Sequence, residues 1–117
     1  MAAEDVDDAV QAAHQAFKTY RTLTPRQRGD LLSKWDSLIR EHEDDIAKIL
    51  VYETGKPLAE AYGEIQYATS FTRWFAAEAE RIQGTVFQPA IAGRRIFTVK
   101  QPIGVAAALV PWNFPIA

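Results

Sequence analysis

The sequence predicts an α/β protein in which helices fill residues 1–84, a β-hairpin arm follows over 85–103, and a buried strand begins at 104. Three observations support this order. Apolar residues recur at steps of three and four through the first part of the chain, which is the spacing of a helix face. After Gly84 the spacing shortens toward alternation, which is typical of strands. The run VAAALV after Gly104 is apolar throughout, as in strands covered on both faces of a sheet.

The first two helices are predicted from an apolar face and a start signal. In the first helix the face consists of Val6, Val10, Ala13, Phe17 and Tyr20. The second helix begins after Thr24, which can cap it, and Pro25 suits the first helical position. Gln27 then completes a capping box. The apolar stripe of this second helix consists of Leu31, Leu32, Trp35, Leu38 and Ile39.

Two further helices are expected on either side of the sequence GKP. The third covers residues 43–54 and ends at Gly55, which can adopt the left-handed conformation that closes a helix. Pro57 can open the fourth helix, which runs to about residue 83. Gly63 lies inside this fourth helix, where glycine is about 1 kcal/mol less favourable than alanine. We expect close packing against a neighbouring element to explain its presence.

The hairpin arm is predicted from residues 85–103, in which β-branched and aromatic residues flank a turn at Gly93. Pro89 and Pro102 limit where the two strands can pair, because proline has no N–H to donate. Residues 104–117 hold the expected buried strand and then the sequence VPWNFPIA. A buried strand of this kind needs parallel neighbours, and the sequence after it supplies none. We therefore expect the chain to be an incomplete part of a doubly wound domain.

Composition narrows the classes of function. The 117 residues fit a single domain, with 48% apolar residues and a net charge of −2. The absence of cysteine excludes disulfides, thiolate metal sites and thiol nucleophiles within these residues. His14 and His42 lie in predicted helices without a set of further ligands, so no metal site is predicted. No basic block indicates nucleic-acid binding, no apolar run has the length of a membrane span, and the N-terminus shows no secretion signal. We therefore expect a cytoplasmic protein.

Three motifs carry a resemblance to a known family. GVAAALVPWNFPIA resembles the start of the cofactor domain in the NAD(P)-dependent aldehyde dehydrogenase superfamily. ETGKPLAEAYGEI resembles the Glu-Thr-Gly-Lys-Pro helix junction of that family, and DVDDAVQAAHQAF is similar to its first long helix. The motifs occur in family order and cover essentially the whole chain. SFTRWFAAEAERIQG is most similar to the succinate-semialdehyde dehydrogenase branch.

The resemblance implies roles for five consecutive residues. Asn113 corresponds to the side-chain amide of the oxyanion hole, which can lower the reaction barrier by roughly 3 kcal/mol. Val110, Pro111 and Trp112 match positions that line the cleft of the cofactor, NAD or NADP. Phe114 matches a wall of the substrate tunnel. The implied parent reaction oxidises a small aldehyde, succinate semialdehyde in the most similar branch, to its acid.

The resemblance also implies what these residues leave out. The catalytic cysteine of the family is absent, and the general-base glutamate and glycine-rich cofactor turn lie beyond residue 117 in relatives. We therefore expect an N-terminal fragment that is inactive alone. The arm over residues 85–103 resembles the one through which family members oligomerise. The chain could instead be a non-enzymatic module that associates with full-length subunits, or a partial gene product without a function of its own.

Two of the motifs also have purely structural interpretations. PWNFP can be a rigid buried turn in which the prolines fix the backbone and Asn113 satisfies nearby backbone groups. ETGKP is interpreted as helix punctuation, with Gly55 and Pro57 marking the boundary. In this interpretation Glu53 and Lys56 are exposed.

Overall fold

The computed structural model describes residues 2–117, which divide into two compact units. One unit, called here the helical unit, contains Thr24–Glu80 and Ala108–Ala117. The other contains the chain up to Leu23 together with Arg81–Ala107. The buried apolar core lies in the helical unit, and the second unit holds one helix and the hairpin arm.

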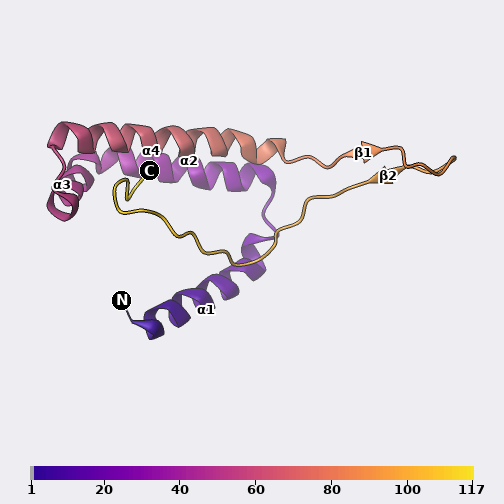
Figure 1. The fold of residues 1–117 in the computed structure, drawn as a ribbon, viewed down its shortest axis with the longest axis horizontal. Helices are drawn as coiled ribbons and strands as arrows, with labels where there is room; N and C mark the ends of the chain where they lie inside the picture. Colours follow the sequence, from indigo (N-terminus) through magenta and orange to yellow (C-terminus); the bar gives the residue numbers. More distant parts are fainter. Residues whose placement is uncertain (1) are drawn as a thin grey trace. The chain divides into compact units, whose positions relative to one another are not determined.

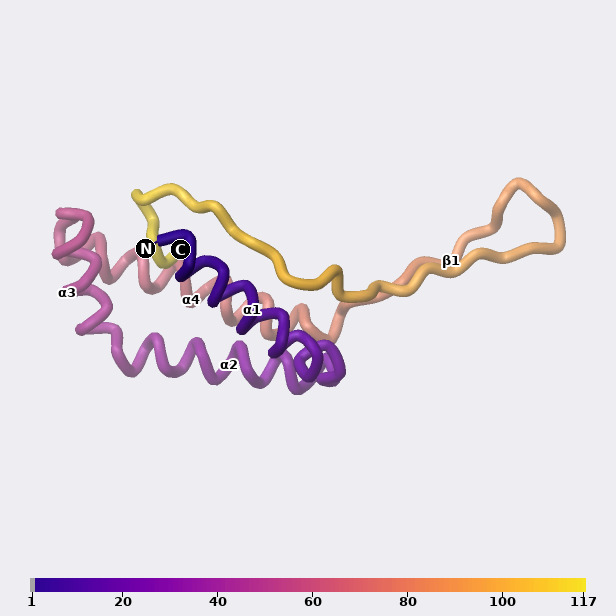
Figure 2. Tube along the Cα trace, turned by 90° about the horizontal axis from the view of Figure 1, so that it is seen from below, coloured from indigo at the N-terminus to yellow at the C-terminus, as the bar shows by residue number. Residues whose placement is uncertain are grey.

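Three helices form the helical unit. α2 spans Pro25–Glu41, α3 spans Glu43–Thr54, and α4 spans Leu58–Glu78 and is followed by a short 3₁₀ helix, η1, at Ala79–Arg81. α2 and α4 run side by side in opposite directions, and α3 connects them at one end (Figure 1, Figure 2). All three predicted helices are present, but α4 ends at Glu78, before the predicted end near residue 83, and only the 3₁₀ helix η1 follows it.

The local sequence signals set the helix ends as predicted. The Gln27 N–H donates to Thr24 Oγ1 over 3.3 Å, and the Thr24 N–H donates to the Gln27 side chain over 2.9 Å, which closes the capping box of α2. Gly55 has a φ of 74°, the left-handed conformation that ends α3. Pro57 then precedes α4 as its cap residue.

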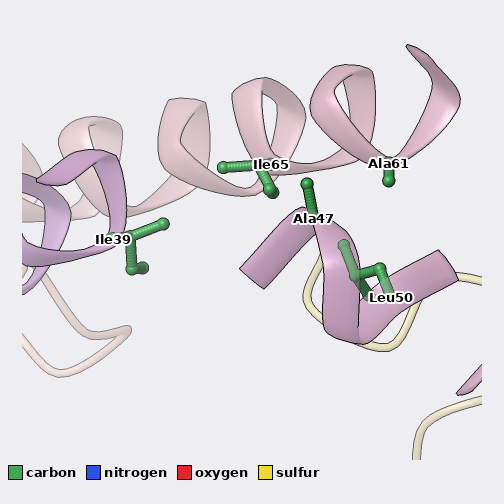
Figure 3. Close-up of a cluster of buried hydrophobic side chains, with 5 residues drawn as sticks. All are labelled: Ile39, Ala47, Leu50, Ala61 and Ile65. Carbon is green, nitrogen blue, oxygen red and sulfur yellow. The ribbon is translucent and has the colours of Figure 1, made fainter. Parts of the chain in front are cut away.

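The core of the helical unit is built largely from small side chains. Its central cluster consists of Ile39 from α2, Ala47 and Leu50 from α3, and Ala61 and Ile65 from α4 (Figure 3). Small residues let the helices approach closely. Gly29 of α2 is an example: a Cβ added to it would lie only 2.7 Å from the carbonyl oxygen of Ala76 on α4. Larger apolar residues on the same helices stay partly exposed, such as Trp35 on α2 and Phe71 on α4.

Two expectations for these helices are corrected. A Cβ on Gly63 would have nothing within 4 Å, so close packing inside residues 2–117 does not explain this glycine. The predicted stripe of α2 is only partly inward, since Ile39 is buried whereas Trp35 is 55% exposed. Leu31 and Leu38 are also exposed. Among the helices and strands of the described residues, α2 packs on α4 and α3, and the outer edge of its stripe is not covered by another of these elements.

The second unit begins with α1, which spans Ala3–Tyr20. The helix is confirmed, but its predicted inward face is only lightly covered, with Val10 49% exposed. A shallow groove within this unit is lined by Val10 and Phe17 of α1 and by Ile103 and Val105, which follow the arm. Apolar contact in this unit is therefore local and sparse.

The arm is a hairpin of two short antiparallel strands, β1 (Val86–Phe87) and β2 (Ile96–Phe97). The Thr98 N–H donates to the Thr85 carbonyl oxygen over 2.8 Å and extends the pairing by one residue. Gly93 has a φ of 75° in the predicted turn. The hairpin is confirmed, but its strands are much shorter than the predicted segment allows.

Residues 104–109 form no strand, which corrects the predicted buried strand. Leu109 is 99% exposed and Val110 is 68% exposed. A strand exists only by pairing its backbone with another strand, and residues 2–117 place none beside this run. The apolar pattern indicates burial, and the described residues do not supply the elements that would cover it.

Candidate functional site

The sequence VPWNFPIA forms a turn that docks on the helical unit. The chain turns at Trp112 and Asn113, and the Ala117 N–H donates to the Phe114 carbonyl oxygen over 3.3 Å. Ile116 is half-buried and packs against the central core cluster. We call residues 112–116 the Asn113 turn.

Lys56 contacts the Asn113 turn from the junction between α3 and α4. Its N–H donates to Thr54 Oγ1 over 3.3 Å, beside the left-handed Gly55 that ends α3. The Lys56 side chain is only 12% exposed, so the prediction that it is exposed is wrong. Its ammonium donates to the Asn113 carbonyl oxygen over 3.1 Å and lies 5.2 Å from the centroid of the Phe114 ring.

Glu64 is the ion-pair partner of Lys56 and is almost completely buried. Its side chain is 1% exposed and comes from α4, where Ala61 and Ala68 are also buried. One carboxylate oxygen pairs with the Lys56 ammonium. The other accepts a hydrogen bond of 3.0 Å from the Ile116 N–H. These partners are what makes the burial tolerable, because an unpaired buried charge is strongly unfavourable.

The Lys56–Glu64 pair therefore holds the Asn113 turn at two points of its backbone, the carbonyl of Asn113 and the N–H of Ile116. The Asn113 side chain behaves differently. It is exposed, and it makes no hydrogen bond within residues 2–117. Its amide is consequently available to a group outside the turn.

The other residues assigned by the resemblance are also exposed. Trp112 is 82% exposed and Phe114 is 49% exposed, and Val110 and Pro111 are open as well. The structure brings them together with Asn113 in one continuous segment. Their roles at the cofactor and the substrate stay predictions, because no contact within residues 2–117 tests them.

Glu64 was missed by the sequence reasoning, although the pattern contains a signal for it. Ala61, Ile65 and Ala68 are spaced as one helix face, and Glu64 falls within that face. A charged residue on an inward face needs a partner, since charged side chains are almost never fully buried unless paired. The nearest lysine in the sequence is Lys56, at the helix junction. This combination could have indicated the ion pair.

Two acid–base groups with shifted pKa values connect the helices elsewhere in the helical unit. Asp36 accepts hydrogen bonds from Arg40 Nε at 2.8 Å and from Thr72 Oγ1 at 2.7 Å. The hydrogen bond from Arg40 lowers the pKa of Asp36 most, and partial burial opposes it. The Tyr62 hydroxyl donates to Asp44 over 2.9 Å, which raises the pKa of Tyr62 above 10.0, and burial adds to the rise. These groups join α2 and α3 to α4.

Other kinds of site are not formed by the described residues. Among residues 2–117, no three His, Asp or Glu side chains gather as metal ligands. None of the helices in this range is both long and apolar enough for a membrane span. An apolar groove does lie next to the Asn113 turn, lined by Trp35, Phe71, Phe75 and Ile116. The candidate site is therefore the Asn113 turn with its anchoring ion pair.

Comparisons with known proteins match the whole chain. The model of the aldehyde dehydrogenase family matches residues 1–117. The chain is 48% identical over its full length to the NADP(+)-dependent succinate-semialdehyde dehydrogenase of Escherichia coli K12. It is 47% identical over its full length to the glutarate-semialdehyde dehydrogenase of Pseudomonas aeruginosa. The chain spans 24% of the length of each of these two relatives.

A solved structure supports the same match. The crystal structure of an E. coli NADP-dependent enzyme aligns with a TM-score of 0.90 and 47% identity. The alignment covers 99% of this chain and 24% of that one. The mostly helical fold with its small two-stranded sheet is thus the fold of the corresponding part of that enzyme.

Proposed function

Because the chain belongs to the aldehyde dehydrogenase family, we propose that it contributes to the NAD(P)-dependent oxidation of a small aldehyde to its acid. Succinate semialdehyde is the proposed substrate, since the E. coli relative is named for it. The P. aeruginosa relative is named for glutarate semialdehyde. The proposed substrate class is accordingly a short aldehyde that carries an acidic group at its other end.

The observation that supports this proposal is the contrast within Asn113, whose backbone is anchored while its side-chain amide is exposed. When a nucleophile attacks an aldehyde carbon, negative charge develops on the oxygen. A hydrogen-bond donor fixed in advance stabilises that charge without further reorganisation. In the proposed function the Asn113 amide donates this hydrogen bond, and the nucleophile comes from outside this cysteine-free chain.

The residues on either side of Asn113 fit contacts with a cofactor and a substrate. Val110, Pro111 and Trp112 form an exposed, proline-stiffened segment along which a cofactor could lie. Phe114 offers half of its surface to the substrate. NAD or NADP, when bound, accepts the hydride from the substrate. The part of this chain is to orient both molecules and to exclude water near the Asn113 amide.

The chain alone is expected to be inactive, because its sequence contains no cysteine to act as the nucleophile. The direct test is incubation of the purified 117-residue chain with succinate semialdehyde and either NAD or NADP. Absorbance of the reduced cofactor should not rise above background. Turnover would refute this part of the proposal.

The role of Asn113 can be tested in a chimera. Residues 1–117 replace the matching quarter of the E. coli succinate-semialdehyde dehydrogenase, and the chimera should oxidise succinate semialdehyde. Asn113→Ala should then lower kcat by roughly 100- to 1,000-fold, as loss of an oxyanion donor does. Gln66→Ala, which removes an exposed amide from α4, is the control and should leave kcat within about twofold. An active chimera that tolerates Asn113→Ala would contradict the proposal.

A second candidate function is favoured by the arm. β1 and β2 are exposed along their whole length, and an open strand edge can pair with another chain. We propose that the arm mediates self-association or association with full-length subunits. Size-exclusion chromatography with light scattering should show a discrete oligomer that Phe97→Asp on β2 reduces to smaller species. A monomer before the substitution would rule out self-association.

A further inference from the structure

The stability of the helical unit alone does not explain the Lys56–Glu64 pair. Only 3% of the Glu64 surface is exposed, and the helix face on which this residue lies is otherwise apolar. Buried ion pairs are weak evidence for stability, because the loss of hydration offsets much of their attraction. An apolar residue at position 64 would extend the core of Ala61, Ile65 and Ala68. The presence of the pair therefore calls for a role other than core stability.

The contacts of the pair indicate that role. Lys56 donates to the carbonyl oxygen of Asn113, and Glu64 accepts from the N–H of Ile116. The two side chains are bonded to each other, so they form one rigid connection between these backbone groups. The Phe114 ring lies against the Lys56 ammonium between the two points. The bond to the Asn113 carbonyl fixes the peptide unit next to the Asn113 Cα, and the bond from Ile116 limits the path of the chain that follows, so together they restrict the direction of the Asn113 Cα–Cβ bond.

A purely local role for the pair is a weaker explanation. The pair could serve only to brace the junction of α3 and α4. That junction is already closed by the left-handed Gly55 and by the Lys56 N–H bond to Thr54. The remaining hydrogen bonds of both side chains go to the Asn113 turn, which lies far from the junction in the sequence.

We propose that Lys56 and Glu64 are a coupled pair of positioning residues that hold the Asn113 side-chain amide in the direction required for oxyanion stabilisation. The direction matters because a donor helps only when it points at the place where charge develops. The catalytic purpose rests on the proposed function of Asn113. The mechanical part, that the pair fixes the turn, depends only on the described contacts.

Amide hydrogen exchange on the 117-residue chain tests the mechanical part. Lys56→Met removes the ammonium with little change in side-chain length. Exchange of the Ile116 N–H should accelerate roughly 10- to 100-fold, as expected when a hydrogen bond to a charged group is weakened. Exchange of the Ala68 N–H in the middle of α4 should change by less than about twofold, because that helix is not opened. Glu64→Gln should give the same local pattern.

The matched control is Lys48→Met. Lys48 also belongs to an ion pair on α3, with Asp45 at 3.3 Å, but both side chains are more than two-thirds exposed. This variant should leave Ile116 exchange unchanged. Equal acceleration at Ile116 and Ala68 in Lys56→Met would show a general loss of stability and would overturn the proposal, as would no acceleration at either amide.

Kinetics in the chimera test the catalytic purpose. Lys56→Met should lower kcat about tenfold while KM changes little, because the donor is misdirected after the substrate has bound. In the Asn113→Ala background the same substitution should have less than about a twofold effect, since there is no amide left to direct. Independent, multiplicative effects would overturn the catalytic purpose. If Asn113→Ala itself has no effect, the proposed function fails, and the exchange result still decides whether the pair fixes the turn.

Discussion

At the scale of single residues, Asp36 shows how one side chain can join two helices. Its carboxylate accepts from Arg40 on its own helix and from Thr72 on α4, and it is 14% exposed. Asp36→Asn should lower the free energy of unfolding by about 1–2 kcal/mol at pH 7, because both hydrogen bonds lose a charged acceptor. Denaturant unfolding measures this loss. Asp45→Asn, which alters an exposed pair, should cost less than about 0.5 kcal/mol.

The same residue gives the chain a pH dependence with a defined sign. Folding lowers the pKa of Asp36 below its ordinary value of 3.8. Its contribution to stability is therefore full above that value and is lost as the pH falls through the lower pKa of the folded state. Between neutral pH and about pH 3, the parent should lose more stability than Asp36→Asn. Parallel losses in the two proteins would contradict this assignment.

Residue-level sequence reasoning identified Asn113 and its neighbours through a motif, and the structure places these residues in one exposed turn. It missed Glu64 and misjudged Lys56. The reason is physical. A motif of consecutive residues can be seen in the sequence, whereas burial of a charge depends on contacts between α4 and a segment some fifty residues later. The one sequence signal for this burial is that Glu64 falls on the apolar face of its helix.

At the scale of elements, two glycines in packed helices should respond in opposite ways to a methyl group. Gly29→Ala places a Cβ 2.7 Å from the Ala76 carbonyl oxygen and forces α2 away from α4, so it should destabilise the chain by about 1–3 kcal/mol. Gly63→Ala meets nothing within 4 Å and should stabilise by about 0.5–1 kcal/mol through helix propensity. Thermal unfolding of both variants measures the difference, and shifts of the same sign would contradict it.

The elements differ in how well the sequence predicts them. Helices with their own start and stop signals, such as α2 after Thr24 and α3 before Gly55, lie where those signals put them. Their hydrogen bonds are local, so the signals are sufficient. The apolar run over 104–109 cannot form its predicted structure from local hydrogen bonds alone. A strand takes its hydrogen bonds from a neighbour, and the pattern alone does not supply that neighbour.

At the scale of the whole molecule, the grouping of segments was the part least accessible to sequence reasoning. The sequence pattern predicts three ranges that follow one another along the chain: helices over 1–84, the arm over 85–103 and the last segment over 104–117. The contacts instead group residues up to Leu23 with Arg81–Ala107, and Thr24–Glu80 with Ala108–Ala117. Such grouping depends on pairings between distant segments, which a period of two or of 3.6 does not encode.

Limited proteolysis should distinguish the exposed arm from the packed helices of the helical unit. Arg94 and Arg95 are exposed in the loop of the arm, between β1 and β2. Trypsin should cut there first, because cleavage needs an extended and accessible backbone. Sites inside α2 and α4, such as Arg40, should be cut only after local unfolding. Mass spectrometry of the first products checks the order, and early cleavage within α2 would contradict it.

The contacts of Lys56 and Glu64 with the Asn113 turn join segments that are far apart in the sequence. Their backbone partners lie 57 and 52 positions later in the chain. Closing a loop of this length is opposed by about 3.5 kcal/mol of entropy beyond a constant. All of α2, α3 and α4 precede Asn113 in the chain, so their residues are synthesised before the Asn113 turn exists. Glu64 can pair with Lys56 as soon as both are made, but it gains its full set of partners only when the Asn113 turn docks on the helical unit.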